Sequence, residues 1–124
     1  MKFHEGQEKL AKFVVAWQEM MTPYREKCIK LSGVDEDDVT NAFNTLNFTN
    51  NHKLSCYFEC QEIQLKFVDP NGNFNISNLA NTVMGTDEEM VKECVQEMPR
   101  GEDICNKGFS IVKCTVQKIL AKLN

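Results

Sequence analysis

The chain has 124 residues, of which 42% are apolar and 26% charged, and its net charge is −4. These values are typical of a folded protein, and we expect residues 1–124 to form a single domain with a buried core. Lys and Arg form no dense run, which argues against a nucleic-acid partner. No apolar stretch approaches the ~20 residues of a membrane-spanning helix, which argues against membrane insertion.

Apolar residues recur at helical spacing and almost nowhere alternate as in a strand. The sequence therefore predicts an all-α fold, a compact bundle of about six helices. Thr22 and Pro23 interrupt the first apolar stripe. Because proline cannot donate a helical hydrogen bond, we expect a kink or break there, with Thr22 capping a second segment. The apolar stripes span residues 10–20, 24–31, 39–46, 54–68, 76–84, 90–98 and 104–120.

Capping and turn residues mark the ends of these helices. Gly33 is expected to end the stretch over residues 24–31, and Gly85 is expected to end the stretch over residues 76–84 as a left-handed cap. Asn50 or Asn51 should begin the third helix, and the turn sequence over residues 69–73 should stop it after Val68.

The later helices carry two further signals. Thr86 and Glu89 have the spacing of a capping box, which predicts that the fifth helix begins there. The last helix should begin near Asp103 and contains Gly108. Glycine lowers helix stability by up to ~1 kcal/mol relative to alanine. Its presence indicates either a close contact with another backbone or a ragged helix start.

The six cysteines are an even number in a short chain, which predicts three disulfides. Cys56 and Cys60 stand four residues apart in a predicted helix, where their Cβ atoms would be roughly 5 to 6 Å apart. A disulfide needs about 3.8 Å, so these two cysteines do not bond each other. Cys105 and Cys114 would stand roughly 13 Å apart along one helix and also need separate partners. The cysteines are Cys28, Cys56, Cys60, Cys94, Cys105 and Cys114.

The cysteine spacing resembles that of the insect odorant-binding proteins, which include the pheromone-binding proteins. The gaps are 27, three, 33, ten and eight residues, and only the 33-residue gap falls at or below the short end of the family's range. The resemblance implies three interlocked bonds around an apolar cavity, Cys28–Cys60, Cys56–Cys105 and Cys94–Cys114. It also implies a binding protein with no enzyme activity.

Disulfides persist in oxidising compartments, so we expect a secreted, extracellular protein. The amino terminus lacks the apolar core of a signal peptide, and we interpret the chain as the mature form with Met1 supplied as a start codon. Asn47 and Asn75 stand in glycosylation sequons, which are compatible with secretion.

Catalytic and metal-binding patterns find little support. His4 and His52 lack the neighbours of a phospholipase His–Asp pair, and the stretch after Asp69 lacks the Gly and Glu of an EF-hand loop. The cysteine gaps do not match a thiolate zinc site. We therefore expect no enzyme, no cofactor and no metal. His52, near a helix start, is the candidate pH sensor, and Leu120, Leu123 or the amino-terminal arm are candidate lids.

Large apolar side chains on the predicted inner faces are the candidates for a cavity lining, although the same residues would equally form a filled core. Methionines would let such a cavity adapt to ligands of different shape. The candidates are Phe13, Trp17, Leu54, Phe58, Leu65, Phe74, Leu79, Val83, Met84, Met90, Phe109, Val112 and Val116.

Alignment with the resembling family places three residues at positions that face the ligand in some relatives: Phe58, Glu62 and Phe67. Glu62 in a cavity could accept a hydrogen bond from an alcohol or, when protonated, bind a carboxylic acid. Its other interpretation is a solvated surface acid beside Gln61 and Gln64. Asn51 and Tyr57 are further candidates for a polar contact.

Together these observations predict a carrier for a small hydrophobic ligand such as an odorant, pheromone, fatty acid, or long-chain alcohol or ester. A chemosensory receptor is a candidate partner, and the expected state is a monomer or weak homodimer. The alternative is a secreted helical effector that acts through its surface and has a filled core. A saposin-like protein fits less well, because its cysteines would pair near both ends of a shorter chain.

Overall fold

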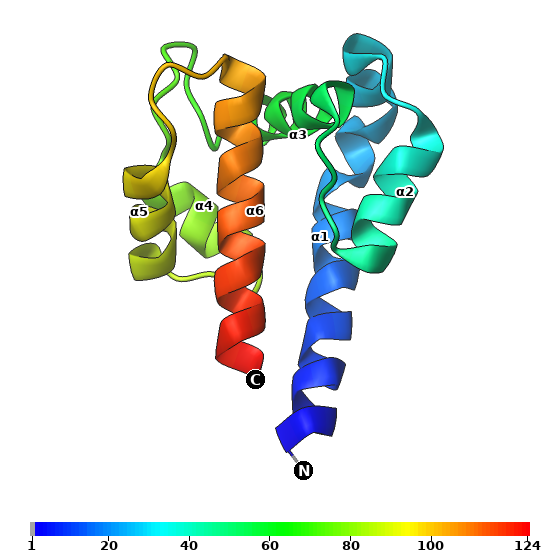
Figure 1. Cartoon of the computed structure of the whole chain (residues 1–124), viewed down its shortest axis with the longest axis vertical. Coiled ribbons are helices and arrows are strands. Elements are labelled where there is room, and N and C mark those ends of the chain that lie inside the picture. Colours follow the sequence, from blue (N-terminus) through cyan, green and yellow to red (C-terminus); the bar gives the residue numbers. More distant parts are fainter. Residues whose placement is uncertain (1) are drawn as a thin grey trace.

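The computed structural model describes residues 2–124 and confirms the all-α prediction. Figure 1 shows α1 and α6 running side by side, with α3 crossing them at one end and both termini at the other. Within residues 2–124, the only pairing of extended backbone is an isolated bridge between Val68 and Phe74. The helices are α1 (Lys2–Ser32), α2 (Glu36–Thr45), α3 (His52–Gln64), α4 (Ile76–Thr82), α5 (Glu88–Glu97) and α6 (Ile104–Leu123).

The break expected at Thr22 and Pro23 is wrong, because α1 continues through both residues. Thr22 does not cap a new helix; its hydroxyl donates to the carbonyl of Gln18 at 2.7 Å. Proline in a helix interior removes the hydrogen bond to the carbonyl four residues earlier, here that of Glu19. Glu19 and Pro23 are both exposed, so water can reach the carbonyl that proline leaves unpaired.

Most helix starts have an Asn or Asp cap. Asn51 caps α3 as predicted, with its side chain accepting from the backbone N–H of Leu54. The capping box predicted at Thr86 is wrong: Asp87 caps α5, and Thr86 instead donates its hydroxyl to the carbonyl of Val83 at 2.7 Å. Gly33 and Gly85 both have positive φ, as their predicted positions after helix ends require.

Helix α3 ends at Gln64, four residues earlier than predicted. Lys66 has a φ of +65°, its N–H donates to the carbonyl of Ile63 at 3.1 Å, and the N–H of Phe67 donates to that of Glu62 at 2.9 Å. This pair of bonds is a Schellman motif. It turns the chain sharply and leaves Phe67 buried below the helix end.

Three disulfides join the helices in the pattern that the resemblance implied. Cys28–Cys60 fastens α1 to α3, Cys56–Cys105 fastens α3 to α6, and Cys94–Cys114 fastens α5 to α6. Both geometric exclusions from the sequence are confirmed. Helix α3 is therefore linked covalently to both of the long helices that it crosses.

The free ends of α1 and α6 also meet. A Cβ added to Gly6 would lie 2.7 Å from the carbonyl oxygen of Leu123, closer than real Cβ contacts come. Only glycine lets the two backbones approach this closely. The α1–α6 pair is thus held by disulfides through α3 at one end and by backbone packing at the other.

Candidate ligand-binding cavity

An apolar cavity lies between α1, α3 and α6. Its free volume is about 60 Å³. All the empty space between its side chains amounts to about 630 Å³ when crevices open to solvent are included. The smaller figure corresponds to room for a few water molecules. The lining residues are Trp17, Met20, Met21, Phe43, Leu46, Phe48, Phe58, Gln61, Glu62, Leu65, Phe67, Leu79, Val83, Ile111, Val112, Thr115, Val116 and Ile119.

Many of the residues proposed from the sequence line this cavity. They come from α1, α3, α4, α6 and the segments that follow α3 and α4, so separate parts of the chain converge on one space. They are Trp17, Phe58, Glu62, Leu65, Phe67, Leu79, Val83, Val112 and Val116.

The remaining proposed residues lie elsewhere. Leu54 and Phe109 are buried in the core that supports the cavity, and Met90 is buried beside a separate crevice near Lys118. Phe13 packs on Gly85, and Phe74 lines an outer cleft next to Gly108.

Met84 points to solvent, with 50% of its surface exposed. Its backbone nevertheless contributes to the site, because its carbonyl accepts a hydrogen bond of 2.7 Å from the indole of Trp17. That bond fixes the ring of Trp17, which is only 5% exposed, against the cavity. The hydrogen bond to Trp17 depends on the backbone carbonyl of Met84 and not on its side chain.

Several lining residues were missed by the sequence analysis. Phe48 lies in the irregular segment between α2 and α3, where no periodicity marks an inner face. Its ring meets those of Phe58 and Phe109 edge-on, at centroid distances of 5.9 and 6.0 Å. Phe58 and Phe109 stack at 5.7 Å. Phe48 and Phe58 thus line the cavity with Phe109 packed behind them, and the cluster ties the segment before α3 to α6.

Glu62 is buried, so its interpretation as a solvated surface acid is wrong. It is 5% exposed, and its Oε1 has no hydrogen-bond partner. A Cβ at residue 108 would overlap Oε1 and would lie 3.3 Å from the Cβ of Glu59. Gly108 is thus explained by close packing of α6 on α3. Burial raises the pKa of Glu62 well above 4.5, and the nearby carboxylate of Glu59 raises it further.

Gln61 is fully buried and also lines the cavity. Its Nε2 donates to the backbone carbonyl of Met21 at 3.0 Å and to the hydroxyl of Tyr57 at 3.1 Å. The carbonyl of Met21 can only accept, which fixes the amide orientation. The Oε1 of Gln61 therefore faces away from Met21, and no donor reaches it.

The sequence model of the PBP/GOBP family matches residues 11–118, which include all six cysteines and every residue of the cavity lining except Ile119. The chain belongs to the PBP/GOBP family. Members of this family are small carriers that bind odorants or pheromones, and they are not enzymes. Within residues 2–124, no helix combines the length and apolar character needed to cross a bilayer.

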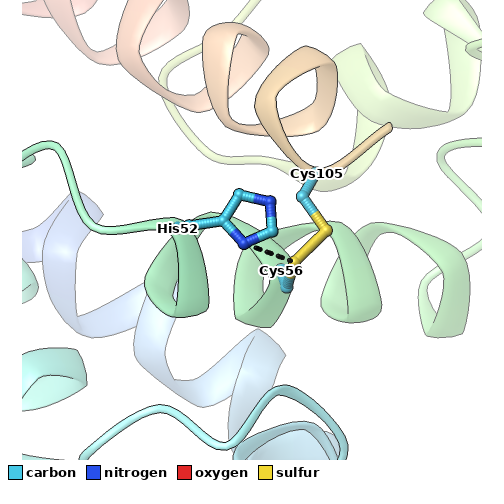
Figure 2. Close-up of side chains that lie close together, drawn as sticks. All are labelled: His52, Cys56 and Cys105. Atoms are coloured by element: carbon cyan, nitrogen blue, oxygen red, sulfur yellow. Dashed lines mark hydrogen bonds between the residues drawn. A yellow bond between two sulfur atoms is a disulfide. The ribbon is translucent and has the colours of Figure 1, made fainter. Parts of the chain in front are cut away.

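One cluster outside the cavity resembles a metal site. Figure 2 shows the side chains of His52, Cys56 and Cys105 close together. Their possible ligand atoms all lie within 4.8 Å of one another. Zinc binds cysteine as the thiolate, whereas these two sulfurs are bonded to each other. In this PBP/GOBP protein the cluster is a disulfide with a histidine beside it.

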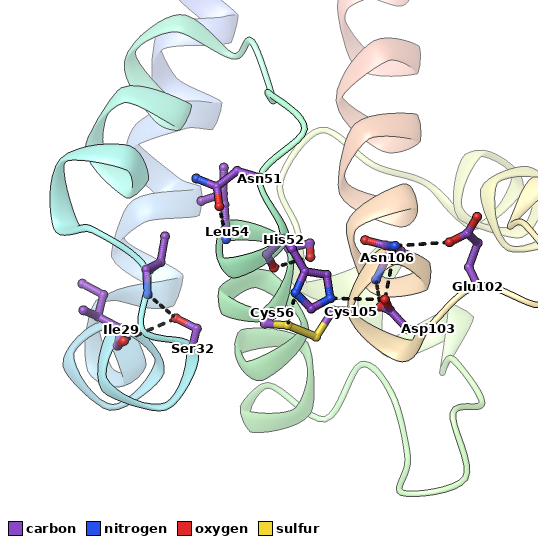
Figure 3. Close-up of a disulfide and its surroundings, with 12 residues drawn as sticks. Ile29, Ser32, Asn51, His52, Leu54, Cys56, Glu102, Asp103, Cys105 and Asn106 are labelled. Carbon is purple, nitrogen blue, oxygen red and sulfur yellow. Dashed lines mark hydrogen bonds and ion pairs between the residues drawn. A yellow bond between two sulfur atoms is a disulfide. The ribbon is translucent and has the colours of Figure 1, made fainter.

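His52, the candidate pH sensor, does not line the cavity. Figure 3 shows its ring between the Cys56–Cys105 disulfide and Asp103. Its Nε2 lies 3.2 Å from the Asp103 carboxylate. The N–H of Asn106 lowers the pKa of Asp103, and His52 adds to this effect. The exposed pair joins the start of α3 to the start of α6. Asn51 and Tyr57 likewise lie outside the cavity lining.

Proposed function

We propose that this protein is a secreted carrier that holds one small apolar molecule in the cavity between α1, α3 and α6. The observation that carries the proposal is an apolar cavity at the junction of helices that disulfides fasten together. Three disulfides also favour an oxidising, extracellular setting. Membership of the PBP/GOBP family supports the same function.

The size of the cavity suggests how a ligand would enter it. A volume that holds a few waters is too small for a chain of eight or more carbons. A ligand would therefore displace lining side chains, and Met20 and Met21 are suited to this because methionine has flexible, polarisable side chains. The covalent links at α3 would preserve the helix arrangement while these side chains repack.

The ligand should be an apolar molecule with one polar group. Apolar side chains cover most of the cavity, and the exceptions are Gln61, Glu62 and Thr115. Within the described residues, no Lys, Arg or His lines this space. An anionic ligand such as an ionised fatty acid would therefore lack a counter-charge, so a neutral compound is favoured.

The small free volume of the cavity also fits the second candidate function, that of an effector that acts through its surface. Leu31 and Ile63 are exposed apolar residues that line one shallow crevice beside Cys60. In that function the interior would remain filled and no small molecule would bind.

A displacement titration tests the carrier function. An apolar fluorescent probe is expected to bind the delipidated protein with one-to-one stoichiometry, and neutral long-chain compounds should compete with it. Val112→Phe, which adds bulk to the lining, should weaken probe binding at least about tenfold. Val15→Phe is the matched control, because Val15 is exposed on α1 and the same change there should leave affinity unaltered.

The effector function predicts the opposite pattern. No apolar probe would then bind with defined stoichiometry, and both variants would behave as the unaltered protein does. Thermal unfolding of each variant, monitored by circular dichroism, separates loss of binding from loss of the fold. A protein with its disulfides reduced serves as a further control, since its helices would no longer be fastened around the cavity.

A further inference from the structure

Two polar side chains that line the cavity, Gln61 and Thr115, have only hydrogen-bond acceptors left to offer. The Oε1 of Gln61 is a buried acceptor without a donor, because Met21 and Tyr57 occupy the amide nitrogen. Thr115 lines the same space, and its hydroxyl donates to the carbonyls of Ile111 and Val112 at 2.7 and 3.1 Å. Thr115 therefore has only acceptor capacity left. Both residues offer lone pairs, and neither offers a hydrogen.

A buried acceptor without a partner is costly, and native proteins leave few of them. The acceptor of Gln61 lies on a residue that is 0% exposed, so bulk water does not reach it. Nothing in the surrounding helices supplies the missing hydrogen. A molecule that enters the cavity with a donor group would satisfy it.

On this basis, and given the carrier function proposed above, we propose that Gln61 selects ligands that donate a hydrogen bond, and that the ligand is a neutral alcohol. A hydroxyl donates to the Oε1 of Gln61 while its chain lies among the apolar residues. Ethers, esters, ketones and aldehydes place only further acceptors beside this oxygen. They leave it unpaired and are discriminated against.

Glu62 supports a hydroxyl over a charged donor. A buried ammonium would need Glu62 as an anion beside it, and both charges would lose their hydration. Glu59 and Glu62, three residues apart on α3, both line the cleft near Gly108, and Lys107 lines that cleft as well. Because burial and Glu59 favour the protonated acid, Glu62 can act as a neutral partner for the alcohol oxygen. An alcohol is compatible with this neutral environment, and an ammonium ion is not.

A pair of isomers provides the most direct test. Octanol and heptyl methyl ether have the same atoms and nearly the same apolar area, but only octanol donates a hydrogen bond. Octanol should displace the fluorescent probe at about tenfold lower concentration than the ether, the factor expected from one hydrogen bond of about 1.4 kcal/mol. Octylamine and octanoate should both compete less well than octanol at neutral pH.

Variants at residue 61 test whether Gln61 causes the preference for octanol over the ether. Gln61→Met keeps the length of the side chain but has no carbonyl oxygen, so it should bind octanol and the ether within about twofold of each other. Gln61→Glu, protonated in this buried place, keeps a carbonyl oxygen and should restore the preference for octanol. Val15→Phe, at an exposed position on α1 outside the cavity, is the control and should retain the preference for octanol over the ether.

Equal competition by octanol and the ether in the unaltered protein would overturn the inference and leave the carrier function standing. A preference that survives Gln61→Met would assign it to another group and would also overturn it. Failure of every compound and of the probe to bind would overturn the carrier function together with this inference. The isomer comparison needs no variant, so a folding defect in Gln61→Met does not remove the test.

Discussion

The carboxyl group of Glu62 occupies the space that a side chain at Gly108 would fill. A Cβ at residue 108 would also lie 3.3 Å from the Cβ of Glu59 and 3.4 Å from its Cα, so α6 packs closely on α3 at this point because residue 108 has none. The arrangement accounts for two features at once, a glycine inside a helix and a carboxylic acid inside the protein. It also makes the two residues energetically dependent on each other.

Gly108→Ala is therefore expected to destabilise the protein by about 1 to 3 kcal/mol, although alanine favours the helix. In a Glu62→Ala background the same change should cost at least about 1 kcal/mol less, because the overlapping oxygen is absent. Urea unfolding of the four proteins measures this coupling as a double-mutant cycle. Identical costs in the two backgrounds would show that the carboxyl does not limit residue 108.

Stability should depend on pH through Glu62. The pKa of Glu62 is raised in the folded state, so the folded protein binds its proton more tightly than the unfolded chain does. The resulting stabilisation is complete below the unfolded pKa of about 4.5 and is lost as pH rises through the higher folded value. Glu62→Gln should remove this decline. Urea midpoints measured from pH 4.5 upward check it, and Glu26→Gln on the exposed surface is the charge control.

The disulfides should differ in their contributions. Cys56–Cys105 closes a longer loop than Cys94–Cys114, with sequence separations of 49 and 20 residues. In the chain-entropy model, replacing the first pair with serine costs about 4 kcal/mol and replacing the second about 3 kcal/mol. Denaturant unfolding of the two double-serine variants gives the order. A larger loss from the shorter loop would indicate that local packing dominates over loop entropy.

Trp17 is the only tryptophan of the chain and lines the cavity. Its emission should therefore change when a ligand enters, without any added probe. Trp17→Phe leaves the carbonyl of Met84 without its donor and should destabilise the protein by about 1 to 3 kcal/mol. Met84→Ala retains that carbonyl and removes a half-exposed side chain, so its effect should be clearly smaller. Comparable losses from both changes would contradict this assignment.

Most of the fold was predicted correctly from the cysteine gaps, from the helical periodicity and from the capping residue Asn51. Each of these features reflects a local or covalent constraint. Pro23 led to the wrong prediction because its cost is local, whereas the contact of Gln61 with Met21 before it and Cys28–Cys60 after it hold α1 against α3. The end of α3 was missed because Lys66, not glycine, adopts the left-handed conformation there. The apolar residues that follow Lys66 continue the helical pattern, so the sequence predicted a longer helix.

Part of the cavity lining was predictable, and part was not. Trp17, Phe58 and Val116 lie on apolar stripes that any packing of amphipathic helices would bury. Gln61 carries no such signal, since a polar residue beside charged and polar neighbours is normally solvated. Only the crossing of α3 over α1 buries its amide. The packing of α6 on α3 at Gly108 encloses the carboxyl of Glu62.

The placement of the crosslinks restricts where the interior can open. Cys28–Cys60 and Cys56–Cys105 fix α1 and α6 to successive turns of α3, so the two long helices cannot separate at that end. At the opposite end they meet through Gly6 and the carbonyl of Leu123, a contact without a covalent bond. A ligand is therefore expected to enter and leave the cavity by fraying of the helix ends near the termini. A bulky tag placed there would alter exchange rates before it altered equilibrium affinity.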